Sequence, residues 1–386
     1  MVPGESFVIE LQGLSRLVAT LGERGYLVIG PTVRSGAIVY DRLDSADDLP
    51  AGYTDVQEPG RYRLERRDDE ARFGYAVGAQ SWKRELLPPE LQLWHARREA
   101  DGDFALVDDA PAPPALAFIG VRSCELHAIQ IQDRVLVGGA HADDDYAARR
   151  REAFIVAVNC GEAGGTCFCV SMQTGPKVGA GHDLALTELL DGEGHRFLVD
   201  VGSARGADVL AELAPQPAGQ RDREAAERAV AHAASQMGRT LDTEGLAELL
   251  QGNREHPRWQ EVADRCLTCG NCTLVCPTCF CTTVEDVTDL AGGEAERKRL
   301  WDSCFNVDFS RMHGGAARAT PPSRYRQWMT HKLSTWWDQF DTSGCVGCGR
   351  CITWCPVGID LTEEAAAIRA TDGAIAKEAA GDHPVG

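Results

Sequence analysis

The sequence of 386 residues lacks a long apolar run and any excess of positive charge. No apolar run approaches the roughly 18 residues that a membrane-spanning helix needs, so we expect none. The N-terminus shows no basic segment followed by an apolar one, so we expect a cytoplasmic protein. Asp and Glu total 58 against 39 Lys and Arg, which gives a formal net charge of −19. Because phosphate groups would repel such a surface, we expect no nucleic-acid or membrane partner.

Motifs for nucleotides and for catalysis are also missing. No G-x-G-x-x-G follows a predicted strand, since Gly179 and Gly181 are followed by Leu184 where the third glycine would stand. The sequence has no P-loop, and no Ser/His/Asp constellation can be assembled from it. We therefore expect no nicotinamide or ATP binding and no catalytic residue in this chain.

Cysteine is absent from residues 1–123 and 170–265 but abundant elsewhere. Of the 15 cysteines, four lie between Cys124 and Cys169 and eleven between Cys266 and Cys355. An odd number of cysteines, in a chain without an export signal, argues against a disulfide framework and favours metal ligation. The simplest interpretation is two metal-binding regions.

The residue pattern predicts an α+β protein of two domains. Residues 1–252 are expected to form a mixed α/β domain, and residues 253–386 a helical two-cluster ferredoxin-like domain with cysteine-rich loops. In the first domain we predict helices at 11–21 and 221–251 and strands at 26–29, 37–40, 115–119, 153–158 and 195–201. In the second, the aromatic residues of 322–340 recur at helical spacing, which indicates core packing.

Two runs of cysteine share one spacing. The first run is Cys266, Cys269, Cys272 and Cys276, and the second is Cys345, Cys348, Cys351 and Cys355; a proline follows each, and each cysteine of the second run lies 79 residues after its counterpart. This is the ligand run of bacterial ferredoxins, in which three cysteines hold one cluster and the fourth ligates the other. We therefore assign one [4Fe-4S] cluster to Cys266, Cys269, Cys272 and Cys355, and another to Cys345, Cys348, Cys351 and Cys276. Structural zinc is the alternative, but its usual paired ligands fit these triplets poorly.

The four cysteines of the first region form a less diagnostic set. Cys124 and Cys160 follow the predicted strands 115–119 and 153–158, at the sheet edge where ligands commonly bind. With Cys167 and Cys169 they would make a third [4Fe-4S] site, although a zinc site or simply buried cysteines also fit. Cys279, Cys281 and Cys304 remain, and we interpret them as buried cysteines near the clusters. The sequence TCFC occurs at both 166–169 and 278–281. The sequence alone gives no physical reason for this repeat.

Residues 344–360 resemble the C-terminal signature of the β subunits of soluble NiFe hydrogenases, also called sulfhydrogenases. The related iron–sulfur subunit of anaerobic sulfite reductase is similar. The likeness to that family extends over roughly residues 115–365. Further segments that resemble the family are 120–126, 159–169, 301–304, 323–328 and 331–332.

The resemblance implies a non-catalytic, iron–sulfur electron-transfer subunit of a hydrogenase complex. It would relay electrons between a flavoprotein subunit that binds NAD(P)H and the small and large subunits of a NiFe hydrogenase. The alternative is the related iron–sulfur subunit of an anaerobic sulfite reductase, which would pass electrons to a sirohaem subunit. Two other hypotheses are an enzyme that reduces sulfur or sulfite at the N-terminal cysteines and a zinc-stabilised assembly module without redox function.

Overall fold

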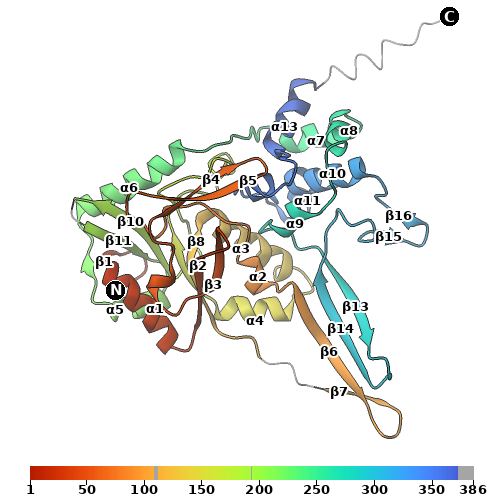
Figure 1. Cartoon of the computed structure of the whole chain (residues 1–386), viewed down its shortest axis with the longest axis horizontal. Helices are drawn as coiled ribbons and strands as arrows, with labels where there is room; N and C mark the ends of the chain where they lie inside the picture. The colour runs from red at the N-terminus through yellow and green to blue at the C-terminus, as the bar shows by residue number, and fades with distance from the viewer. Residues whose placement is uncertain (108–111, 193, 373–386) are drawn as a thin grey trace, which may run out of the picture.

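The computed structural model describes residues 1–107, 112–192 and 194–372. Its largest element is an eight-stranded sheet of order β12-β1-β11-β10-β9-β8-β2-β3 (Figure 1). The strands are β1 Ser6–Glu10, β2 Leu27–Arg34, β3 Ala37–Arg42, β8 Leu116–Arg122, β9 Phe154–Val158, β10 Leu184–Asp191, β11 Gly194–Val201 and β12 Gln216–Pro217. The four central strands β2, β8, β9 and β10 are parallel and the outer pairings are antiparallel, which confirms the mixed α/β prediction.

Helices cover both faces of this sheet. Every residue of β8 and β9 is buried, as expected for central parallel strands. Ala117 and Ile119 of β8 pack in one apolar core with α1 and α5, whereas Phe118 and Val121 pack in another with α3 and α4. The change of face after Ile119 occurs at Gly120, where the strand register shifts and φ is +93°. These helices are α1 Leu11–Glu23, α3 Ser123–Leu136, α4 Asp144–Glu152 and α5 Ala204–Ala211, and α6 Gln220–Ser235 packs on β10 and β11.

The second part of the chain contains the helices that the sequence predicts, with one interruption. The aromatic segment forms α10 Pro321–Thr330, a π-helical turn η2 at His331–Thr335, and α11 Trp336–Phe340. Tyr325 and Trp328 pack with Trp259 and Ile352 in one core, and Trp336 packs in another with Val77 and Val346, which confirms the core packing predicted for this segment. The other helices are α7 Leu246–Gly252, α8 Arg258–Ala263, α9 Asn271–Leu274, α12 Arg350–Thr353 and α13 Leu361–Ala370. The helix predicted over 221–251 is divided, because 236–245 lie outside α6 and α7.

A projecting four-stranded sheet was not predicted. Its order is β13-β14-β6-β7, and Figure 1 shows it extending away from the body of the molecule. The strands are β6 Glu90–Arg98, β7 Phe104–Val107, β13 Thr282–Thr288 and β14 Glu294–Trp301. The expectation of a helical stretch between the cysteine runs is therefore wrong over 282–301, where β-branched residues and a polar turn favour a hairpin. Since β6 pairs with β14, this sheet joins the two predicted domains, and the boundary at residue 252 stays a prediction.

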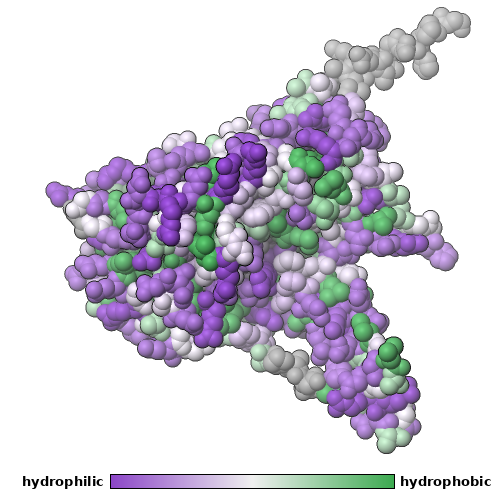
Figure 2. Space-filling model, in the orientation of Figure 1, coloured by the Kyte–Doolittle hydropathy of each residue, from purple (hydrophilic) through white to green (hydrophobic). Residues whose placement is uncertain are grey.

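Shorter elements complete the fold. They are the hairpins β4 Tyr53–Glu58 with β5 Arg61–Arg66 and β15 Arg311–Met312 with β16 Gly315–Ala316, and the helical turns η1 Ala46–Asp48 and α2 Lys83–Leu86. Within the described residues, no helix combines the length and the apolar character needed to cross a membrane. Figure 2 shows polar residues over most of the visible face, with apolar residues near the tip of the projecting sheet.

Candidate metal centres

The two cysteine runs fold into the same local structure. Thr268 and Gly347 occupy equivalent positions, and both have left-handed backbones with φ of 51° and 64°. Their backbone N–H groups donate to the first sulfur of each run, Cys266 Sγ and Cys345 Sγ, at 3.4 Å in both cases. The spacing repeat in the sequence is therefore a structural repeat.

Each run continues through a glycine into a short helix. Gly270 and Gly349 both have φ of 75° and stand directly before α9 and α12. A Cβ atom on Gly349 would lie 2.4 Å from the backbone oxygen of Thr166. A side chain at residue 349 is therefore excluded both by the backbone conformation and by the segment packed against it.

We expect Gly349→Ala to destabilise the protein by more than about 1 kcal/mol, because alanine is strained at positive φ and would clash with Thr166. The matched variant Gly314→Ala, where a Cβ would meet no atom within 4 Å, should leave thermal unfolding close to the wild type. Calorimetry of both variants checks this prediction. Equal melting temperatures for the two would contradict the tight packing of this loop.

The structure brings the fourth cysteine of each run to the opposite triplet. One cavity is lined by Cys266, Cys269, Cys272 and Cys355, together with Cys351 of the other set. Burial, and after it the thiolates of Cys266, Cys355 and Cys269, raise the pKa of Cys272. Burial and then the thiolates of Cys345, Cys348 and Cys276 raise the pKa of Cys351. Four thiols around each centre form the donor set that a [4Fe-4S] cluster requires.

A buried lysine lies beside the second set. Lys332, which is 3% exposed, donates from Nζ to Cys276 Sγ at 3.1 Å, to Thr278 Oγ1 at 3.1 Å and to the oxygen of Gly344 at 3.0 Å. A hydrogen bond from Cys279, assisted by the charge of Lys332, lowers the pKa of Cys276 in spite of burial. In the sequence, Lys332 belongs to a basic stretch with Arg311, Arg318, Arg324 and Arg326 between the cysteine runs. Such a stretch is usually a solvated helix face, and it can also offset cluster charge or dock an acidic partner; the structure instead buries Lys332 beside Cys276.

Lys332 belongs to the π-helical turn η2, and such turns often occur at functional sites. The turn follows α10 directly and precedes α11, so the lysine is held between two helices, whose Trp328 and Trp336 pack in two different apolar cores. A cation fixed beside sulfur favours the anionic form of that sulfur, which is the form that binds iron.

The four N-terminal cysteines also gather at one place. Cys124 lies in the first turn of α3, Cys160 follows β9, and Cys167 and Cys169 lie in the loop beyond it. Burial and then the thiolate of Cys160 raise the pKa of Cys167 to about 12. Burial and then the thiolates of Cys160 and Cys167 raise the pKa of Cys169 as well.

This third group adjoins the second cysteine run. Burial, and after it the thiolates of Cys348 and Cys169, raise the pKa of Cys124. The N–H of Phe168 donates to the oxygen of Gly347 at 2.8 Å, and Thr174 Oγ1 donates to the oxygen of Val346 at 2.7 Å. The loop that carries Cys167 and Cys169 therefore packs directly on the loop that carries Cys348.

A buried ion pair joins the first turn of α3 to the first residue of α12. Arg350 and Glu125 are each 1% exposed, and Arg350 Nη2 lies 2.5 Å from Glu125 Oε1. Tyr40 Oη and Trp82 Nε1 also donate to this carboxylate, at 2.8 and 3.1 Å. Because Glu125 follows Cys124 and Arg350 precedes Cys351, the pair joins the residues next to two predicted ligands.

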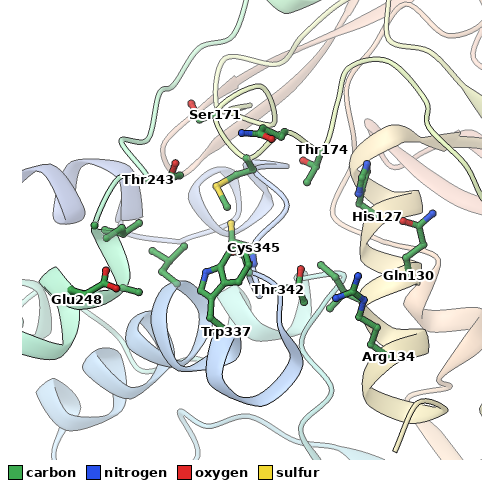
Figure 3. Close-up of a pocket in the computed structure, with 18 residues that line it drawn as sticks. His127, Gln130, Arg134, Ser171, Thr174, Thr243, Glu248, Trp337, Thr342 and Cys345 are labelled. Carbon is green, nitrogen blue, oxygen red and sulfur yellow. Dashed lines mark hydrogen bonds between the residues drawn. The ribbon is translucent and has the colours of Figure 1, made fainter.

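A cavity of about 410 Å³ reaches the second cysteine run from outside. Figure 3 shows Cys345 and Trp337 on one side of it and His127, Gln130 and Arg134 of α3 on the other. Within residues 1–107, 112–192 and 194–372, no group of three or more His, Cys, Asp or Glu side chains is placed to hold a single metal ion.

Comparisons with known proteins agree with this arrangement. Residues 265–359 match the family described as the 4Fe-4S dicluster domain, which supports the prediction of two clusters. Sulfhydrogenase 2 subunit beta of Pyrococcus furiosus is 32% identical over 337 residues, a match that covers 86% of this chain and 89% of that subunit. No solved structure matches the chain. The predicted resemblance is thus confirmed, and the chain belongs to the family of sulfhydrogenase beta subunits that carry a 4Fe-4S dicluster domain.

Proposed function

We propose that this chain relays electrons between a flavoprotein subunit that binds NAD(P)H and the small and large subunits of a NiFe hydrogenase, and that it catalyses no reaction itself. The observation that carries the proposal is the contiguity of three sets of four cysteines. Each [4Fe-4S] cluster, when bound, takes up and releases one electron, with a potential set by nearby charge, hydrogen bonds and burial.

The proposed path has three centres. Cys124, Cys160, Cys167 and Cys169 would hold the first cluster, Cys345, Cys348, Cys351 and Cys276 the second, and Cys266, Cys269, Cys272 and Cys355 the third. Cys348 is an electrostatic neighbour of Cys124 in the first set. Cys351 lines the cavity of the third set. The second centre therefore lies between the other two.

Two points of this path face outward. Cys269 is exposed, and Leu267 and Val357, which line the same cavity, are 61% and 37% exposed. Cys345 lines the 410 Å³ cavity, which Arg134 and His127 also line. Exposed apolar side chains around a buried redox centre are suited to docking a partner protein, so we assign the Cys269 end to one of the partner subunits.

We expect Lys332→Met to make the potential of the second cluster more negative, because reduction adds an electron beside a site that has lost its cation. A redox titration followed by electron paramagnetic resonance (EPR) measures this potential. The matched variant Lys298→Met lies on the projecting sheet and should change no potential. Unchanged potentials in Lys332→Met would contradict the proposed place of the second cluster.

The function is tested on the native complex, purified without oxygen. We expect the chain to be recovered together with a flavoprotein and a nickel-containing large subunit, and the complex to reduce NADP with hydrogen. Recovery without nickel but with a sirohaem subunit would contradict the hydrogenase assignment. Turnover of sulfur or sulfite by the isolated chain would contradict the relay.

A further inference from the structure

Three cysteines stand outside the twelve proposed ligands, and the fold brings them together. Cys279, Cys281 and Cys304 line one cavity, which His331 and Lys332 also line. Its volume of about 20 Å³ is close to the 30 Å³ of the cavity lined by Cys266, Cys269, Cys272 and Cys355. Both are narrow, thiol-lined cavities beside the same aromatic helix.

The projecting hairpin β13–β14 brings these cysteines close together. Thr282 pairs with Trp301 where β13 and β14 begin and end, and the N–H of Asp302 donates to the oxygen of Cys281 at 2.9 Å. Cys304 lies two residues after Asp302, in the turn that follows β14, and Cys279 lies two residues before Cys281. Cysteines that are distant in sequence are thus brought to one end of a hairpin.

Two buried lysine side chains, Lys332 and Lys83, lie near the three thiols. Lys332 Nζ lies 3.5 Å from Cys279 Sγ. Lys83, which is 4% exposed, places its Nζ 4.1 Å from the ring centroid of Trp301 and donates to the backbone oxygens of Thr273 and Leu274. Within the described residues, no ion pair joins a carboxylate to Lys83 or Lys332. Burial lowers the pKa of Lys83, so the buried cation of this group is Lys332, beside which ligating thiolates and a cluster would supply negative charge.

The TCFC repeat acquires a structural meaning here. Phe168 in the first copy donates to Gly347, and Thr278 in the second donates from Oγ1 to the oxygen of Gly344 at 2.7 Å. Both copies therefore flank the loop at 344–349, and the threonine of each copy is fully buried. The first copy supplies two of the proposed cluster ligands, and the second presents Cys279 and Cys281 with the same spacing.

We propose that Cys279, Cys281 and Cys304 bind a fourth [4Fe-4S] cluster, with the imidazole of His331 as the fourth ligand. His331 Nε2 lies 3.1 Å from Gln339 Oε1, which would leave Nδ1 for iron, and a ligating histidine commonly donates its other N–H to such an acceptor. This inference rests on the proposed function, since it requires a chain that is loaded with iron–sulfur clusters.

The test is iron and acid-labile sulfide per chain in the complex purified without oxygen. The wild type should contain about sixteen iron atoms in this chain, and Cys304→Ser should lose about four, with the EPR signals of the other clusters kept. The exposed neighbour variant Val307→Ala should lose none. If Cys304→Ser does not fold, His331→Gln should change the spectrum of one cluster only.

Alkylation of the native complex gives the second measurement. We expect Cys279, Cys281 and Cys304 to resist alkylation until iron is chelated, and mass spectrometry identifies the labelled residues. About twelve iron atoms in the wild type, with these cysteines labelled or joined in a disulfide, would overturn the fourth cluster and leave the three-cluster relay intact. Iron-free protein would overturn the proposed function instead.

Discussion

Cys348→Ser is expected to remove the second cluster and reduce hydrogen-linked NADP reduction to background. Cys348 is a proposed ligand of the middle centre, and its thiolate acts on Cys124 in the neighbouring set. Losing the middle centre separates the outer two, so electrons can no longer pass. Hydrogen oxidation with an artificial dye should survive, because the dye can accept electrons at the hydrogenase module directly.

The measurement compares iron content and both activities in complexes purified without oxygen. We expect a loss of about four iron atoms per chain in Cys348→Ser. Thr342→Ser, on the wall of the cavity that reaches Cys345, should keep both the iron and the relay. Full iron with unchanged NADP reduction in Cys348→Ser would show that electrons take another path.

Breaking the buried pair of Arg350 and Glu125 should have the largest effect on stability. Arg350→Met leaves a carboxylate that is 1% exposed without its cation, and removing one partner of a buried pair typically costs about 3–5 kcal/mol. Tyr40 and Trp82 would still donate to Glu125 but would not neutralise it. We therefore expect a large decrease in melting temperature and weaker retention of the adjoining clusters.

The double variant Arg350→Met with Glu125→Gln should recover part of the lost stability, because the uncompensated charge is gone. As a control, Asp286→Asn breaks an exposed pair with Arg297 on the projecting sheet and should hardly change the melting temperature. Thermal unfolding of the three variants separates these cases. A melting temperature for Arg350→Met as high as that of the control would contradict the structural role of the pair.

Features that are encoded locally could be predicted from the sequence. The cysteine runs have a spacing that sets the loop geometry, so Thr268 and Gly347 adopt equivalent conformations. The apolar runs ending near Cys124 and Cys160 form the central strands β8 and β9, because continuous apolar residues suit strands buried on both faces. The aromatic stripe of 322–340 forms helix because its spacing matches one helix face.

Features that depend on contacts between distant segments could not be predicted. β14 pairs with β6, which lies about 200 residues earlier in the chain, and neither strand alone signals its partner. Lys332 becomes important only because the fold places its Nζ beside Cys276. The convergence of Cys281 and Cys304 likewise requires the hairpin that the helical interpretation missed.

The central claim is that the two cysteine runs enclose iron–sulfur clusters close enough to exchange electrons. EPR spectroscopy of the chemically reduced complex, prepared without oxygen, tests it most directly. We predict signals of reduced [4Fe-4S] clusters, broadened by magnetic interaction between neighbouring centres. A spectrum without any cluster signal, from protein that contains zinc but no acid-labile sulfide, would contradict the claim.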